Sequence, residues 1–160
     1  MAILQLHDQV VRDALRELAG REIKHTGDGI MASFFSAVAA ARCANRIHRA
    51  LALYEQEKKG IPIKVRIGAA AGEPVEDHMD LFGSTVQLAA RLCSHAQPEQ
   101  SLVSNVVAEL SYTEPVMPPA PFPIPAPKTL VSAPMIKPLI VPLSPNKLQP
   151  VPLIVTARQR

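Results

Sequence analysis

Tryptophan is absent from the sequence, and aromatic residues make up only 4% of its 160 positions. Cysteine is also scarce: Cys43 and Cys93 are the only two, and they form no C-x-x-C pair. Both fall at apolar positions of predicted helices. We therefore expect buried thiols in a reducing compartment rather than a disulfide scaffold. The five histidines are scattered without metal-ligand spacing, which argues against a histidine-based metal site.

Long hydrophobic runs are missing as well. No apolar stretch reaches the roughly 18 residues that a membrane-spanning helix needs. The first 20 residues carry five charged side chains, unlike a secretory signal peptide. We therefore expect a cytoplasmic chain with no membrane span.

Glycine and proline divide the chain into two parts. All seven glycines lie at or before Gly83, whereas 13 of the 16 prolines lie at or after Pro115. Charge divides in the same way: residues 1–110 carry 12 Lys+Arg against 13 Asp+Glu, and residues 111–160 carry 5 against 1. We predict a folded domain over residues 1–110 and a Pro-rich tail over 111–160. The near-neutral domain argues against nucleic-acid binding.

The tail includes the polyproline-like stretch PPAPFPIPAP at residues 118–127. Proline removes backbone donors and breaks helices, so we expect residues 111–160 to be extended and without stable secondary structure. The tail is nevertheless rich in Val, Leu and Ile. An SH3-type ligand, a spacer and an artefact of the reading frame all remain open.

Hydrophobic periodicity in residues 1–110 predicts alternating helices and strands. We expect helices at 3–19 (with Gly20 as its C-cap), 36–59, 84–96 and 105–110, and strands at 21–25, 29–35, 61–71 and 101–104. Residues 72–81 are expected to be a loop, in which a short strand remains open. In the helix at 84–96, Phe82, Val86, Ala89, Ala90 and Cys93 form the predicted apolar face, opposite a polar stripe of Ser84, Gln87, Arg91 and His95. A hairpin followed by crossover helices favours an α/β (α+β) domain with a ferredoxin-like, split βαβ sheet.

Two stretches of this domain carry most of the functional information: IKHTGDGIMASF at residues 23–34 and DLFGSTVQLAARLC at residues 80–93. Together, and in this order, they resemble the class III adenylate/guanylate cyclase catalytic domain. The HD-x-x-V-R-x-A-L helix before them and the segments IKVRIG and AGEPV between them fit the same pattern. The resemblance covers roughly residues 3–110.

The resemblance implies that Asp28, in the Thr-Gly-Asp-Gly turn, ligates a metal ion. Glycines on both sides would let this carboxylate project and let a phosphate approach closely. Mg²⁺ or Mn²⁺ would be the cofactor, in a two-metal site that activates the attacking hydroxyl and stabilises the leaving pyrophosphate. Read alone, Asp28 is an ordinary Asp-Gly turn residue.

Four further residues match the family's substrate-binding and catalytic positions. Lys24 and Asp80 match the pair that reads adenine: a lysine donates to a ring nitrogen and a carboxylate accepts from the exocyclic amine. Arg91 matches the arginine that neutralises charge in the transition state. Gln87, one helical turn before Arg91, stands where the family usually has Asn. Read alone, all four are solvated polar residues.

One family motif, a first strand bearing F-x-D-I-x-x-S/T, does not occur in the 160 residues. In the family its Asp is the other metal ligand, so only one ligand, Asp28, is present here. We therefore expect a truncated domain that lacks its first strand, with a gap in its sheet. The family's closing strands, which carry a further phosphate-binding Lys, are replaced by the Pro-rich tail.

The resemblance implies a class III adenylate cyclase that converts ATP to cyclic AMP and pyrophosphate in cyclic-nucleotide signalling. It also implies a homodimer or a heterodimer with another cyclase domain. With one metal aspartate missing, we expect the chain to be inactive alone. The alternatives are a non-catalytic dimerisation or regulatory module and a gene fragment.

Overall fold

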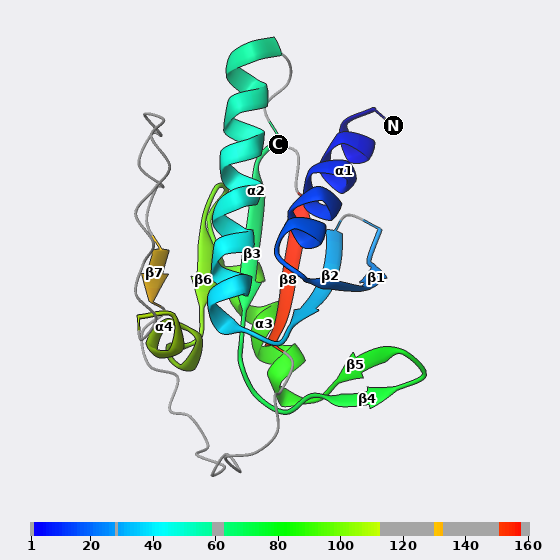
Figure 1. Ribbon diagram of the computed structural model, residues 1–160, viewed down its shortest axis with the longest axis vertical. Coiled ribbons are helices and arrows are strands. Elements are labelled where there is room, and N and C mark those ends of the chain that lie inside the picture. Colours follow the sequence, from blue (N-terminus) through cyan, green and yellow to red (C-terminus); the bar gives the residue numbers. More distant parts are fainter. Residues whose placement is uncertain (1, 28, 59–62, 113–129, 133–150, 158–160) are drawn as a thin grey trace.

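The computed structural model describes the whole chain except residues 1, 28, 59–62, 113–129, 133–150 and 158–160 (Figure 1). The helices are α1 (Ala2–Glu17), α2 (Ala37–Lys58), α3 (Ser84–His95) and α4 (Asn105–Tyr112). The strands are β1 (Arg21–His25), β2 (Gly29–Phe34), β3 (Val65–Ala69), β4 (Val75–Asp77), β5 (Asp80–Phe82), β6 (Ser101–Val103), β7 (Leu130–Ser132) and β8 (Val151–Ala157). Every element predicted in residues 1–110 is present. The strand expected at 61–71 is shorter, with β3 covering Val65–Ala69, and the expectations for residues 59, 61 and 62 lie outside the described residues.

The main sheet has six strands in the order β1-β2-β8-β3-β6-β7. Strand β8 is antiparallel to both β2 and β3, so the unit β2-α2-β3 is a split βαβ with one strand inserted between its two strands. Helices α1 and α2 cover one face of this sheet and α3 covers the other (Figure 1). The predicted fold class is therefore confirmed.

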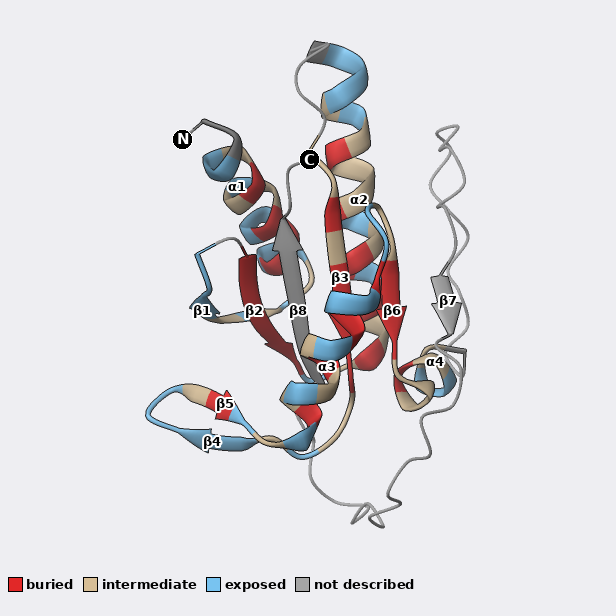
Figure 2. Cartoon of the chain, turned by 180° about the vertical axis from the view of Figure 1, so that it is seen from behind, coloured by how far each residue is buried: buried red, intermediate tan, exposed pale blue. Residues whose placement is uncertain are grey.

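Two hydrophobic clusters hold the layers together (Figure 2). The larger one joins α1, α2 and α4 to the sheet and includes Val11, Phe34, Ile47 and Ile67, all 0–1% exposed. The smaller one lies under α3 and includes Ala89 and Leu92. Since side chains alternate along a strand, β3 contributes Ile67 to the first face and Gly68 to the second.

Glycine permits two close approaches in this core. A Cβ added at Gly68 would lie 2.2 Å from the carbonyl oxygen of Ala89, so α3 can pack directly on the backbone of β3. A Cβ at Gly20 would lie 2.6 Å from the Phe34 ring. The predicted C-cap role of Gly20 needs correction: Ala19 is the residue with positive φ (55°) after α1, and the Gly20 N–H bonds the Leu15 carbonyl at 2.8 Å.

The stretch at 72–81, expected to be a loop with at most a short strand, forms most of a two-stranded hairpin. Strands β4 and β5 pair with each other and extend sideways from the body of the molecule (Figure 1). Their two-residue turn is His78-Met79, both with positive φ (47° and 67°), as in a type I′ turn. The sequence did not reveal the hairpin because this turn usually carries Asn and Gly.

The expectation that residues 111–160 have no stable secondary structure is wrong for three stretches: the end of α4, which runs to Tyr112, and strands β7 and β8. Strand β8 also occupies the sheet position that was expected to be a gap. Its sequence VPLIVTA is rich in β-branched residues, which favours a strand. Pro152 lies where β8 has only β2 beside it, because pairing with β3 begins at Leu153, so its missing N–H is tolerated.

Two expectations from composition can also be examined. Cys43 and Cys93 are both buried, as predicted, and neither forms a disulfide; burial raises the pKa of the Cys43 thiol to about 12. Among the helices described, none combines the length and the apolar character needed to cross a bilayer.

Candidate functional site

Lys24 and Asp80, predicted from separate motifs, lie against each other in the structure. Lys24 is on β1 and Asp80 begins β5, and their Nζ and Oδ2 atoms are 2.5 Å apart. The side chains are 43% and 27% exposed, so the pair faces solvent and is accessible to a ligand. Arg21 on β1 and Glu76 on β4 form a second ion pair, in which a guanidinium nitrogen lies 2.7 Å from Oε1. These two pairs fasten the β4–β5 hairpin to the edge of β1.

Asp80 is fixed from two directions. The hydrogen bond from Lys24 is the main reason why the pKa of Asp80 lies below its usual value, and a bond from the Leu81 N–H to Oδ1 at 2.8 Å acts in the same direction. The carboxylate is therefore charged at neutral pH. Phe82, two residues further along β5, places its ring centroid 5.5 Å from the Lys24 Nζ.

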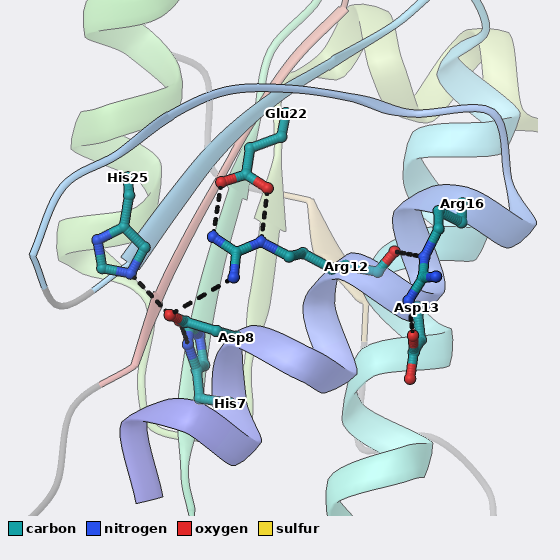
Figure 3. Close-up of polar contacts among 7 residues, drawn as sticks. All are labelled: His7, Asp8, Arg12, Asp13, Arg16, Glu22 and His25. Carbon is teal, nitrogen blue, oxygen red and sulfur yellow. Dashed lines mark hydrogen bonds and ion pairs between the residues drawn. The ribbon is translucent and has the colours of Figure 1, made fainter. Parts of the chain in front are cut away.

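The other side of β1 is held by helix α1 (Figure 3). The Arg12 guanidinium donates two bonds to Glu22, at 2.8 and 2.9 Å. Asp8 lies between His7 at 2.9 Å and His25 at 3.0 Å. Burial raises the pKa of Asp8, but the hydrogen bonds and charges of the two histidines outweigh it, and the net shift is downward. Strand β1 is thus clamped between α1 and the hairpin.

A bulge in β1 determines which side chains of this strand face α1 and which face the β4–β5 hairpin. Glu22 pairs with Ala32 but Lys24 pairs with Met31, so Ile23 is the extra residue. In a regular strand Glu22 and Lys24 would share a face. Here Glu22 contacts α1, whereas Lys24 contacts the hairpin. The bulge therefore turns Lys24 toward Asp80.

The Thr26-Gly27-Asp28-Gly29 turn closes the β1–β2 hairpin. The Thr26 N–H bonds the Gly29 carbonyl at 2.8 Å, and Gly27 has a φ of 90°, which requires glycine. The Gly27 N–H donates to His25 Nδ1 at 3.1 Å. The predicted metal ligand Asp28 lies outside the described residues.

A divalent cation is implied by the motifs, but the described residues do not fit one by themselves. Nowhere in the described part of the chain do three or more His, Cys, Asp or Glu side chains gather into a group that could hold an ion. The Asp8–His25 contact is a partly exposed ion pair. We therefore assign no chemical step to a metal on this chain.

Gln87 and Arg91 lie one turn apart on α3, and both are exposed as predicted. The chain passes from β5 to α3 through Gly83, whose φ of 108° is rarely adopted by other residues. Asp80 of the predicted purine pair and the predicted catalytic residues Gln87 and Arg91 therefore stand on consecutive elements, β5 and α3, joined by Gly83.

Phe82 is the residue that the periodicity placed wrongly. It was expected on the apolar face of α3, but it lies on β5 and is 47% exposed. Gly83 separates it from the helix, and that glycine was the available signal. The α1 side of the clamp was missed as well, because contacts between a helix and a strand leave no local periodicity.

Comparison with known proteins identifies the family of this chain. Residues 1–116 match the family described as the adenylate and guanylate cyclase catalytic domain. The chain belongs to this family. A solved structure, the adenylate/guanylate cyclase/hydrolase from Silicibacter pomeroyi, is similar with a TM-score of 0.62 and 27% identity, over 93% of this chain and 79% of that one.

Curated relatives give the same family. "Putative adenylate cyclase 3" of Rhizobium meliloti is 35% identical over 91 residues, 56% of this chain and 16% of that protein. The adenylate cyclase of Mycosarcoma maydis is 31% identical over 132 residues, 67% of this chain and 5% of that protein. The chain thus spans a small part of the curated relatives that it matches.

Proposed function

We propose that this cyclase domain binds ATP and contributes the purine-reading and transition-state residues of an adenylate cyclase site, which converts ATP to cyclic AMP and pyrophosphate. The observation that carries the proposal is the 2.5 Å contact between Lys24 and Asp80. These residues come from motifs 56 positions apart, and the fold brings one donor and one acceptor together at an accessible edge.

The pair suits adenine better than guanine. Adenine offers a ring-nitrogen acceptor beside an exocyclic amine donor, whereas guanine offers a ring N–H donor beside an oxygen acceptor. A lysine ammonium only donates and an ionised aspartate only accepts. Lys24 and Asp80 in their present order therefore complement adenine and oppose guanine.

Arg91 would act on the phosphates. Its guanidinium cannot lose its proton and can donate two parallel bonds to phosphate oxygens, so it would stabilise charge that develops as the 3′-hydroxyl attacks the α-phosphate. Gln87, on the same face of α3, would donate an amide hydrogen bond to the reacting groups. Its extra methylene relative to Asn changes the reach of that amide by about one bond length.

Asp28 remains the proposed metal ligand on this chain, for Mg²⁺ or Mn²⁺. A single carboxylate does not readily hold two divalent ions beside a triphosphate. Strand β8, between β2 and β3, has the sequence VPLIVTA, which contains no acid. We therefore propose that a second cyclase domain, in a homodimer or heterodimer, supplies the missing carboxylates.

The same observation favours a second candidate function. A domain whose central strand carries no acid could serve as a non-catalytic partner that dimerises with and regulates an intact cyclase. The two candidates differ in whether Arg91 of this chain is needed for cyclic AMP formation.

Nucleotide binding tests the proposal. Competition titration of the full chain with ATP and GTP should give tighter binding of ATP. Lys24→Glu should abolish that preference, because a carboxylate repels the adenine ring nitrogen. Lys64→Glu is the charge-matched control, because Lys64 lies next to β3 and is remote from β1. Equal affinities for the two nucleotides, or an unchanged preference in Lys24→Glu, would contradict the assignment.

A further inference from the structure

Adenine recognition by Lys24 and Asp80, as proposed above, depends on their order and not only on their presence. If the ammonium and the carboxylate could exchange places, the donor would face the guanine oxygen and the acceptor would face the guanine ring N–H. The pair would then accept GTP. Selectivity therefore requires that both side chains be held in position.

A backbone hydrogen bond holds the Asp80 carboxylate in place, whereas the Lys24 side chain needs a further contact to hold it. The Leu81 N–H bonds Asp80 Oδ1 at 2.8 Å, which leaves Oδ2 for Lys24. Lys24 is a long side chain, 43% exposed, and an exposed ion pair alone restrains such a chain weakly. A further contact is needed to keep the ammonium in one place.

We propose that Phe82 is a specificity-determining positioning residue that holds the Lys24 ammonium beside Asp80. Its ring centroid is 5.5 Å from Nζ, within the range of a cation–π contact. The ring is 47% exposed and is absent from both hydrophobic clusters, so core packing does not explain its position. Lys24 is thus held between a carboxylate and an aromatic ring.

The backbone on both sides of this contact is fixed. Phe82 pairs with Val75 in the β4–β5 hairpin, and Gly83 turns the chain directly into α3. Lys24 is aimed by the Ile23 bulge in β1. The ring and the ammonium therefore meet because two rigid elements meet, which favours a contact that persists when nucleotide binds.

The experiment measures position and selectivity separately. In nuclear magnetic resonance spectra of the full chain, ring current from Phe82 should shift the Lys24 ε-methylene protons upfield. Phe82→Leu should return them toward ordinary lysine values, and Phe82→Tyr should keep the shift. Met79→Ala, at the 79% exposed tip of the same hairpin, is the control and should leave the shift unchanged.

In competition titrations, Phe82→Leu should lower the ATP-over-GTP preference by about two- to fivefold, the loss of one exposed cation–π contact. Phe82→Tyr should keep the ATP-over-GTP preference of wild type. An unchanged lysine signal or an unchanged preference in Phe82→Leu would overturn the inference. If wild type binds neither nucleotide, the proposed function fails instead, and the lysine signal still decides whether Phe82 positions Lys24.

Discussion

At the scale of single residues, hydrogen bonds select the tautomer of a histidine beside the glycine-rich turn. His25 Nδ1 accepts from the Gly27 N–H, so in the neutral ring the proton is on Nε2, which donates to Asp8. One imidazole thus links helix α1 to the start of the Thr26–Gly29 turn. This link supports the hairpin that also carries Lys24.

A second histidine makes the stability of the fold depend on pH. His48 on α2 bonds Ser101 at 2.9 Å, and burial lowers its pKa below the usual 6.5. The unfolded chain therefore binds a proton at His48 more readily than the folded one. The stabilisation is complete above pH 6.5 and is lost as the pH falls through the folded pKa.

We expect the melting temperature of wild type to fall as the pH is lowered from 7.5 to 5.5, and to fall less in His48→Gln, which cannot take up that proton. Calorimetry at several pH values measures both curves. The account of His48 is wrong if the two proteins lose the same number of degrees over this range.

At the scale of elements, the sequence predicted what local periodicity determines. The helices and strands of residues 1–110 were recognised because their apolar positions repeat with the period of their structure and cluster into one core. The β4–β5 hairpin was not recognised, because His78 and Met79 stand in a turn that usually carries Asn and Gly. The bulge at Ile23 was missed because it is visible only in the pairing with β2.

Strand β8 is the longest element that the sequence analysis did not predict, because its pairing partners lie far away in the sequence. Pro150 and Pro152 indicate an extended tail, and nothing within residues 151–157 specifies β2 and β3 as partners. The strand forms because β2 and β3 offer their backbone groups as pairing partners on its two sides. Of the candidate site, the motifs indicated Lys24, Asp80, Gln87 and Arg91 as candidate residues, but neither the Lys24–Asp80 contact nor the proposed role of Phe82.

The position of β8 predicts the effect of one substitution. From Leu153 onward β8 has a strand on both sides, so the N–H of Ile154 faces one of them. Ile154→Pro should remove that bond and reduce the free energy of unfolding by about 3 kcal/mol or more. Urea unfolding measures this change, with Leu148→Pro, outside the bounds of β8, as the matched control.

Hydrogen exchange gives the second readout for β8. Amides of β2 and β3 should exchange faster in Ile154→Pro than in wild type, because each strand loses a neighbour. Unchanged exchange in both strands together with unchanged stability would contradict the central placement of β8.

At the scale of the whole molecule, the centre of the sheet and the candidate site are built from different elements. Segments far apart in the chain, β2 with β3 and β8, complete the sheet, while the proposed purine pair, Lys24 and Asp80, lies at its outer edge on β1 and the β4–β5 hairpin. The edge keeps the Lys24–Asp80 contact, although the sequence of the central strand β8 contains no acid. This arrangement supports the proposal that the chain contributes one half of an adenylate cyclase site.

Cyclic AMP formation tests this claim most directly. The full chain should form no measurable cyclic AMP with ATP and Mn²⁺. Mixed with a homologous domain that keeps both metal aspartates but lacks its own purine-reading lysine and transition-state arginine, it should form cyclic AMP. That activity should be lost with Arg91→Ala in this chain and retained with Arg42→Ala, on α2, as the control. Turnover by the chain alone, or a silent mixture of two proteins that co-purify, would contradict the half-site account.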